Sequence, residues 1–388
     1  MKIRYGEKDE LEKAKEIWQE CFTDSKEEVD FYFSTLYKRE NYLVLEENQE
    51  VKASLHENKY NLVIGGEIVP SFYIVGVAVL PQFRGRGYMK ELISHSLNSA
   101  KDKGFEFVYL APINSALYRK LGFEHITDLE KYNFSMNELE NKKIDRDYYI
   151  KKLESHLIDR DICDLIDIYG TTMKDFFLYV KRDKRTFKNL LSEIFSDGGE
   201  VYIFYRNGTP EGYLTFYKDE KIFVREIFGK NKHVIDTMLG FLKTFKEYYP
   251  DIVIQTPVRQ ALNFYFDNQK KIEKTVEPFI MGRIVNPAAI LARVAKKDMN
   301  IKIRIDDDVI KSNSGFYTLE NGHVTFSEVG TWDIRVGIGA LAQLLFGYST
   351  FDELVFRDKI QLNGDESRKK AQSWNISGVL KNYISEYQ

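Results

Sequence analysis

The sequence predicts two consecutive α/β domains, each with a mixed sheet, followed by a smaller α+β domain. Its length of 388 residues corresponds to about two or three domains of ordinary size. Helical and extended patterns also occur twice in the same order: helices, hairpin strands, a central strand, a helix and a further strand. The pattern changes near Phe279, so we expect domains at 1–140, 141–278 and 279–388.

The first domain is expected to surround a buried central strand. A strand at 2–5 precedes a helix whose apolar residues have helical spacing, and Asp24 and Ser25 open a second helix. Strands at 41–48 and 51–64 lead through the hairpin turn "IGGEI" to the apolar strand "FYIVGVAVLP", which we expect to be buried on both faces. A helix that ends at Gly104, the strand "FEFVYLAP" and a short helix in "NSALYRKLGFEHI" complete the domain.

The second domain follows the polar segment 137–147 and repeats this order. Helices are expected near 160–178 and 184–196, and they are followed by the strands "EVYIFYR", "EGYLTFYK" and "KIFVREIFG". A helix "HVIDTMLGFLKTFKEYY" and a strand "DIVIQTP" end the repeat. The third domain has a helix in "PAAILARVAK", three strands, and a strand-to-helix segment "DIRVGIGALAQLLFG".

Composition excludes several classes of protein. The net charge is −3, from 56 basic and 59 acidic residues, whereas a general nucleic-acid binder needs a basic excess. Two cysteines, Cys21 and Cys163, form neither a disulfide framework nor a zinc site, and we expect no metal. We find no N-terminal signal peptide pattern and no apolar run approaching ~20 residues. A cytoplasmic protein without a membrane span is therefore expected.

The segment "VAVLPQFRGRGYMKELI", Val77 to Ile93, carries the clearest chemical signal. Gln82-x-x-Gly85-x-Gly87 lies between an apolar strand and a helix. Glycines let a ligand approach the backbone, and successive N–H groups at a helix start bind anions such as phosphate. Arg84 and Arg86 add positive charge. The segment lacks the Gly-Lys-Ser/Thr of a nucleotide P-loop and the spacing of a dinucleotide site. The alternative is an ordinary strand-to-helix turn.

Together with "FVYLAPINSALYRKLGF", this segment resembles the GCN5-related N-acetyltransferases (GNATs), whose Q/R-x-x-G-x-G/A loop holds the pyrophosphate of acetyl-CoA. The whole-chain order resembles the Eis (enhanced intracellular survival) family. In that family an active GNAT domain, a degenerate second one and a sterol-carrier (SCP2)-like domain follow one another. "MGRIVN" and "VGIGALAQLLFGY" are similar to its third domain. In the second domain "FGKNKHVID" replaces the glycine turn, which indicates that it is degenerate.

The resemblance implies a role for individual residues. The backbone of Val77, Ala78 and Val79 would pair with the pantetheine arm, and Ile113 and Asn114 would lie beside the cofactor. Tyr118 would be the general acid that protonates the leaving thiolate; the alternative is a core tyrosine. The pyrophosphate would be held by the residues of the glycine turn and of the helix start: Gly85, Arg86, Gly87, Tyr88, Met89 and Lys90.

The central strand has no Glu or His in an obvious position for the base. The family places the terminal carboxylate in the active site, here that of Gln388, as an anchor or through a water; the alternative is a frayed terminus. His56 and Glu57 lie on a neighbouring strand and are interpreted as ordinary exposed or satisfied residues. Asp30 and Glu386 would attract a cationic amine, with solvated surface charge as the alternative.

The predicted function is acetyl-CoA-dependent N-acetylation of a primary amine, on an aminoglycoside-like polyamine, a small polyamine or a lysine side chain. Direct attack in a ternary complex is expected, because neither cysteine lies near the motif in sequence. The family implies a homo-oligomer, a hexamer. Compared with the family, the loop has one arginine fewer than in some members and the chain ends in Gln388 rather than an aromatic residue. The alternative function is a non-catalytic CoA-sensing or lipid-binding scaffold.

Overall fold

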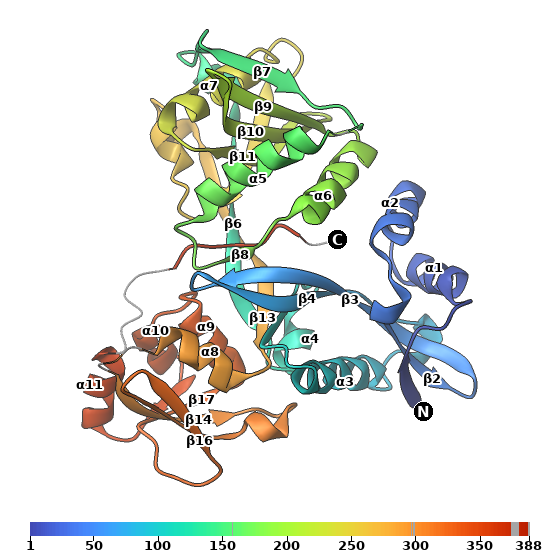
Figure 1. The fold of residues 1–388 in the computed structure, drawn as a ribbon, viewed down its shortest axis with the longest axis vertical. Coiled ribbons are helices and arrows are strands. Elements are labelled where there is room, and N and C mark those ends of the chain that lie inside the picture. Colours follow the sequence, from blue (N-terminus) through green and yellow to red (C-terminus); the bar gives the residue numbers. More distant parts are fainter. Residues whose placement is uncertain (157, 296, 298, 374–379, 387–388) are drawn as a thin grey trace. The chain divides into compact units, whose positions relative to one another are not determined.

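The computed structural model describes residues 1–156, 158–295, 297, 299–373 and 380–386 (Figure 1). The chain forms two compact units. Unit 1 contains residues 1–127, 177–181 and 279–388, and unit 2 contains residues 128–176 and 182–278. The boundaries 1–140, 141–278 and 279–388 expected from the sequence remain a proposal, and the two units are described separately below.

The larger sheet of unit 1 has the strand order β1-β2-β3-β4-β5-β13-β6, and β8 pairs with both β3 and β19. Its strands are β1 (Lys2–Tyr5), β2 (Tyr42–Glu47), β3 (Glu50–Ile64), β4 (Glu67–Val79), β5 (Phe107–Leu110), the start of β6 (Glu124–Ser135), β8 (Leu178–Val180), the end of β13 (Glu273–Ile284) and β19 (Asn382–Tyr383). Its helices are α1 (Leu11–Cys21), α2 (Lys26–Phe31), the π-helix η1 (Tyr32–Leu36), the 3₁₀ turns η2 (Arg39–Asn41) and η3 (Pro81–Phe83), α3 (Tyr88–Asp102) and α4 (Ser115–Arg119).

Helices cover both faces of this sheet, because its strands are apolar on both sides. On β2, Leu43 and Leu45 join the core cluster that contains α3, whereas Tyr42 and Val44 join the cluster that contains α1 and α2. Successive side chains of a strand point to opposite faces, so this alternation places α3 on one face and α1 and α2 on the other.

A β-bulge interrupts β4 at Gly76. Ser54 of β3 faces Ala78 and His56 faces Val75, so two residues of β4, Gly76 and Val77, oppose a single residue of β3. Gly76 has φ of +60°, and a Cβ there would come within 2.3 Å of the Trp18 ring. The bulge therefore needs glycine both for its backbone conformation and for space.

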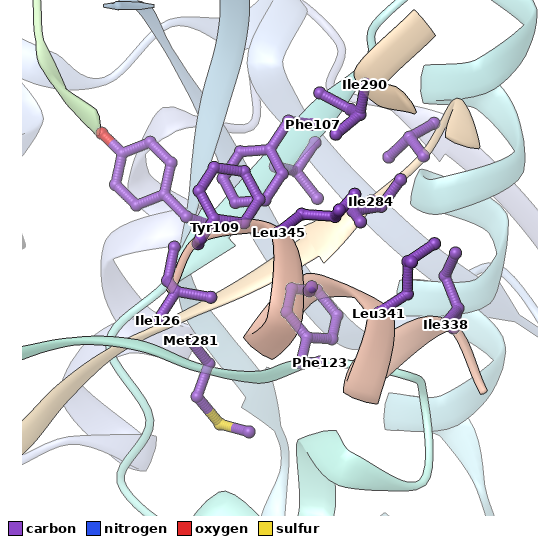
Figure 2. Packing of buried hydrophobic residues seen from close by; sticks show 14 of the residues in the cluster. Phe107, Tyr109, Phe123, Ile126, Met281, Ile284, Ile290, Ile338, Leu341 and Leu345 are labelled. Carbon is purple, nitrogen blue, oxygen red and sulfur yellow. The ribbon is translucent and has the colours of Figure 1, made fainter. Parts of the chain in front are cut away.

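The C-terminal part of unit 1 is an α+β fold with the strand order β16-β15-β14-β17-β18. Its α9 directs Ile338, Leu341 and Leu345 into the core that also contains Phe107 and Phe123 (Figure 2). Its elements are α8 (Pro287–Val294), β14 (Asn300–Asp306), η7 (Lys311–Asn313), β15 (Gly315–Glu320), β16 (His323–Ser327), β17 (Ile334–Gly337), α9 (Ile338–Leu345), α10 (Phe351–Phe356), β18 (Ile360–Leu362) and α11 (Asp365–Ser373).

Unit 2 repeats the architecture of the first domain, with the strand order β6-β12-β11-β10-β9-β7. Helix α7 packs Val234, Met238 and Leu242 against Phe204 and Leu214 of the sheet. The elements are the end of β6, η4 (Met136–Leu139), β7 (Tyr148–Lys152), α5 (Asp159–Met173), α6 (Lys184–Ser196), β9 (Glu200–Arg206), β10 (Thr209–Lys218), β11 (Ile222–Gly229), α7 (Lys232–Lys243), β12 (Asp251–Pro257), η5 (Leu262–Tyr265), η6 (Gln269–Lys271) and the start of β13.

The tandem α/β organisation followed by an α+β fold confirms the predicted fold class. Two local expectations were incomplete. The second helix was expected to be continuous, but after Phe31 it becomes a π-helix in which the Tyr37 N–H bonds to the Tyr32 carbonyl at 2.9 Å. The central strand was expected as an apolar strand, and the bulge that it carries at Gly76 was not foreseen. Within the described ranges, no helix combines the length and apolar character needed to cross a bilayer.

The bulge gives a stability prediction. The Gly76→Ala variant should lose about 2–4 kcal/mol of unfolding free energy, because its Cβ meets the packed Trp18 ring in a left-handed backbone conformation. Gly104→Ala is the matched control, since Gly104 has φ of +80° but open space around its Cβ position. It should lose only about 1 kcal/mol. Chemical denaturation measures both, and equal losses would show that the Trp18 contact is not limiting.

Candidate acetyl-CoA site

The glycine turn is open on its ligand-facing side. Gly85 has φ of +79° and Gly87 has φ of +84°, a conformation that favours glycine. A Cβ built at either position would meet no atom within 4 Å. Glycine is therefore required here by the backbone conformation and not by crowding, and the space in front of the turn is available to a ligand.

Backbone N–H groups line this open turn. Gly87 precedes α3 and caps it with no side chain, and the first bond of the helix runs from the Glu91 N–H to the Gly87 carbonyl at 3.1 Å. In the described part of the chain, no N–H from Gly85 to Lys90 donates to another backbone group. These donors and the positive end of the α3 dipole form an anion-binding surface.

Side chains around the turn hold it in place and add charge. The Arg84 Nε donates to the Val79 carbonyl at 3.1 Å, and the Arg86 guanidinium lies over the Phe83 ring at 5.4 Å. Tyr88 is buried and donates from its hydroxyl to Glu47 at 2.8 Å. Tyr88 can therefore contribute only its backbone N–H to a ligand, whereas Arg86 and Lys90 are exposed.

The strand edge beside the turn is also open. Strands β4 and β5 are parallel and pair at one position, Tyr73 with Tyr109, after which β4 continues to Val79 and β5 ends at Leu110. The Leu80 N–H donates to Lys52 of β3 at 3.1 Å. The backbone N–H and C=O groups of successive strand residues point in opposite directions. Those of Val79 therefore point away from β3, toward the side on which β5 no longer pairs with β4. Ala78 is buried, whereas Val77 and Val79 are half-buried.

Helix α4 follows β5 and carries the predicted acid. Ile113 is 87% exposed, and the Asn114 side chain accepts from the Ala116 N–H at 3.0 Å as the N-cap of α4. Tyr118 is buried, and its ring meets Phe123 edge-on with centroids 6.1 Å apart. Burial raises the pKa of Tyr118 to about 12. Its hydroxyl has no hydrogen-bond partner among the described residues, and it is not sealed from solvent.

Cys21 lies beside the glycine turn, which corrects the expectation that neither cysteine is near the motif. Its Sγ lies 3.6 Å from the Val79 carbonyl oxygen, and Arg84 is also close. Cys21 and Val79 are 58 positions apart in the sequence, and they come together because α1 packs on β4. Burial raises the pKa of the Cys21 thiol, and the opposing effect of Arg84 is smaller. A neutral thiol is a poor nucleophile, so direct attack is still favoured.

The neighbouring ionisable residues are buried rather than exposed. His56 lies against Trp18, with ring centroids 5.5 Å apart, and burial lowers its pKa to about 3. Glu57 accepts from Ser96 at 2.7 Å and from Tyr5 at 3.0 Å, and burial raises its pKa. His56 is therefore neutral in the folded protein, and both side chains are covered by core packing.

The segment before the C-terminus is built into unit 1. Strand β19 runs parallel to β8, and Asn382 donates to the carbonyls of Ile126 at 3.0 Å and Phe346 at 2.7 Å. Glu386 is buried and therefore is not a solvated surface charge, whereas Asp30 is exposed and lies 3.6 Å from Lys15. Gln388, expected to supply a carboxylate, lies outside the described residues.

Sequence reasoning missed two features of the site. One is the bulge at Gly76, for which an isolated glycine inside an apolar strand was an available signal. The other is a contact between Ser115, the first residue of α4, and His125 of β6, whose Nε2 is 2.9 Å from the Ser115 Oγ. Ten positions separate these residues, and no local pattern pointed to the pair.

The corresponding region of unit 2 is closed. Helix α7 begins after Asn231, whose side chain accepts from the Val234 N–H at 3.1 Å and so occupies the helix start. Strands β11 and β12 pair only from Ile222 to Val224, and just beyond them Glu226 forms a fully buried ion pair with Arg182 at 2.6 Å. Although burial opposes ionisation, Arg182 lowers the pKa of Glu226 to about 2. The helix start that is open in unit 1 is therefore capped by a side chain in unit 2.

Comparison with family models agrees with this geometry. Residues 2–126 and 178–284 each match an acetyltransferase (GNAT) domain, and residues 287–375 match a sterol carrier protein domain. Eis1 from Mycobacterium abscessus has the same fold along both whole chains, with 100% of each covered, a TM-score of 0.81 and 18% identity. The chain therefore contains two acetyltransferase (GNAT) domains followed by a sterol carrier protein domain.

Other solved structures share this three-part fold. A GCN5-related N-acetyltransferase from Anabaena variabilis matches with a TM-score of 0.84 and 17% identity, and 100% of each chain is covered. A conserved protein from Enterococcus faecalis described as a probable N-acyltransferase matches with a TM-score of 0.86 and 17% identity, covering 100% of this chain and 99% of that one. At these identities the likeness concerns the fold. The comparison with curated proteins gives no match.

The GNAT assignment implies that acetyl-CoA is the acetyl donor, and the open glycine turn of unit 1 fits its phosphate groups. Both the turn and the strand edge belong to the first GNAT domain. The family match for the second GNAT domain concerns its fold, because its helix start is capped by Asn231.

The buried His56 gives a pH prediction. Its folded pKa of about 3 lies below the ordinary value of about 6.5, so the unfolded chain takes up a proton first and stability falls as pH drops below about 6.5. By pH 4.5 the loss from this residue should be about 2.5 kcal/mol. Denaturation curves of the wild type and of His56→Phe from pH 7 to 4.5 measure it. The variant should lose less stability over this range, and parallel losses would contradict the prediction.

Proposed function

We propose that this Eis-like acetyltransferase transfers the acetyl group of acetyl-CoA to a primary amine by direct attack in a ternary complex. The observation that carries the proposal is the open backbone surface of Gly85–Lys90 next to the unpaired edge of β4. Val77, Ala78 and Val79 would pair with the amides of the pantetheine arm as an added strand does. Ile113 and Asn114 would border the same arm from the other side of the opening.

The β4 edge and the turn position the donor, which supplies an activated acetyl thioester. A β4 N–H near Val79 that points away from β3 would polarise the thioester carbonyl, in the way that oxyanion-hole donors do. The N–H groups from Gly85 to Lys90, with Arg86, would hold the pyrophosphate. Binding the two ends of the donor separately fixes the reacting carbon relative to α4.

Tyr118 is proposed as the acid. As the C–N bond forms and the C–S bond breaks, the amine gives up a proton to solvent or to a nearby carboxylate, and the thiolate takes one from the phenol. Because the pKa of Tyr118 is raised to about 12, its hydroxyl stays protonated across the neutral range and is available as a donor. The terminal carboxylate of Gln388 is proposed as an anchor for the amine, directly or through a water.

The acceptor is proposed to be an amine-bearing small molecule, with an aminoglycoside-like polyamine as the first candidate and a lysine side chain as another. The buried Glu386, two residues before Gln388, would add negative charge for a cationic substrate. We also propose a cytoplasmic location and a hexameric assembly, which rest on the family resemblance alone.

The test is release of CoA thiol with a panel of amines that includes an aminoglycoside, spermidine and a lysine-containing peptide. Wild type should turn over at least one of them. Tyr118→Phe should lower kcat about 100-fold or more at unchanged KM for acetyl-CoA, since only the acid is removed. Tyr248→Phe is the matched control, because Tyr248 is 82% exposed and belongs to unit 2. Full activity of Tyr118→Phe would assign the acid to another group.

Direct attack gives a separate prediction for Cys21. Cys21→Ala should keep turnover of the same order, because no acetyl group passes through the thiol. Mass spectrometry of wild type incubated with acetyl-CoA alone should find no acetylated peptide that contains Cys21. Loss of turnover in the variant, combined with an acetylated Cys21 in wild type, would replace direct attack by a two-step mechanism.

A further inference from the structure

A second pocket, of about 270 Å³, lies in unit 1 and shares no residue with the glycine turn. Four parts of the chain line it: the end of α4 with the following turn (119–124), the end of β14 with the following loop (306–309), the start of α9 (337–340 and 343), and Asp358 with Lys359. Strands β14 and β17 are parallel and end together here, with Asp306 opposite Gly337. The carboxyl ends of adjacent parallel strands are a common position for ligands.

Gln343 is a largely buried polar side chain at this pocket. It lines the pocket and is 7% exposed, and among the described residues none forms a hydrogen bond with its carboxamide. It lies one turn after Gly339 on the same face of α9, and helical side chains lean toward the N-terminus of their helix. Gly339 has no side chain that could cover the Gln343 carboxamide. The amide atoms of Gln343 are not sealed from solvent, so they are accessible to a ligand in the pocket.

The start of α9 presents donors to the same space. Gly337 precedes the helix and provides no side-chain cap, so the first N–H groups of α9 have no partner within the helix. A Cβ on Gly337 would meet no atom within 4 Å, which shows that the pocket reaches the backbone. The helix dipole favours negative charge at this end.

Most carboxylates in the lining are already neutralised. Asp307 pairs with the buried Arg283 at 2.6 Å, and Asp306 pairs with Arg335 at 2.6 Å and with Arg304 at 3.2 Å. Glu124 pairs with Arg119 at 3.1 Å. These acids therefore contribute little net negative charge to the pocket.

The remaining charges favour an anion. Lys120 and Lys359 line the pocket and form no ion pair with a described residue, whereas Asp308 pairs with Lys311 at 3.4 Å and Asp358 is the remaining carboxylate. No group of three or more His, Cys, Asp or Glu residues in the described ranges is arranged to hold a metal ion. Among the described residues, the lining therefore has two ammonium groups and a helix N-terminus, but only one carboxylate, without an ion-pair partner.

We propose that this pocket is a second ligand site, which binds a small oxyanion, a carboxylate or phosphate group. The N–H groups at the start of α9 and the Gln343 amide would bind its oxygens, and Lys120 and Lys359 would balance its charge. The volume equals that of about nine water molecules at ~30 Å³ each, which restricts the ligand to a small molecule. Lys120 follows Tyr118 by two residues, so the site adjoins the catalytic helix without belonging to the acetyl-CoA cradle.

The test is calorimetric titration of the full-length protein with inorganic phosphate and, separately, with succinate. Saturating CoA is present so that the glycine turn is filled. We expect one saturable site for at least one of the two anions, and the anion that saturates identifies the group. Gln343→Leu and Lys359→Gln should each weaken binding about tenfold, and Gln343→Glu should abolish it by repulsion. Lys8→Gln, at an exposed lysine outside the lining, should bind like wild type.

Thermal unfolding of each variant distinguishes lost binding from lost folding. Gln343→Leu should remain about as stable as wild type, because the Gln343 carboxamide forms no hydrogen bond with a described residue. The proposal is overturned if neither anion saturates, if affinity is the same in all variants, or if spermidine binds in place of the anions. Gln343 lies outside the glycine turn. If CoA does not bind, the effect of Gln343→Leu on anion affinity can therefore still be measured, and the two proposals are tested separately.

Discussion

The candidate site depends on one constraint: β4 and β5 pair at a single position and then separate. Separation leaves a row of backbone groups on β4 without a neighbouring strand, and unpaired groups of this kind are what an extended ligand can bind. The bulge at Gly76 shapes the same row, and it is held from behind by Trp18 in the aromatic cluster around His56. The open edge is therefore supported by a rigid core, and its polar groups need not move to receive the donor.

The two GNAT domains differ in how the polar groups beside the helix start after the central strand are satisfied. In unit 2 the side chain of Asn231 caps the helix start, and Glu226, just beyond the paired part of β11, forms a buried ion pair with Arg182. In unit 1 the equivalent positions carry glycine and unpaired N–H groups. One domain satisfies its polar groups internally, and the other leaves them for a ligand, so the fold persists with or without a site.

Much of this could be predicted from the sequence, because local patterns carry it. Apolar periodicity predicted the elements, and Gly85 and Gly87 between a strand and a helix predicted the anion site. Contacts between distant residues could not be predicted in this way. The contact of Cys21 with Val79, the burial of His56 and the pair of Ser115 with His125 depend on which helix packs on which strand. The pocket beside Gln343 depends on how four separate segments of the chain meet.

Calorimetry of CoA binding to wild type and to a Gly85→Ala/Gly87→Ala variant, read as stoichiometry and affinity, would test the role of the glycine turn. We expect one equivalent of CoA per chain, because the helix start after the glycine turn of unit 1 is open and that of α7 in unit 2 is capped, and binding at least about tenfold weaker in the variant. Two equivalents per chain, or unchanged affinity in the variant, would contradict the claim that the glycine turn of unit 1 is the cofactor site.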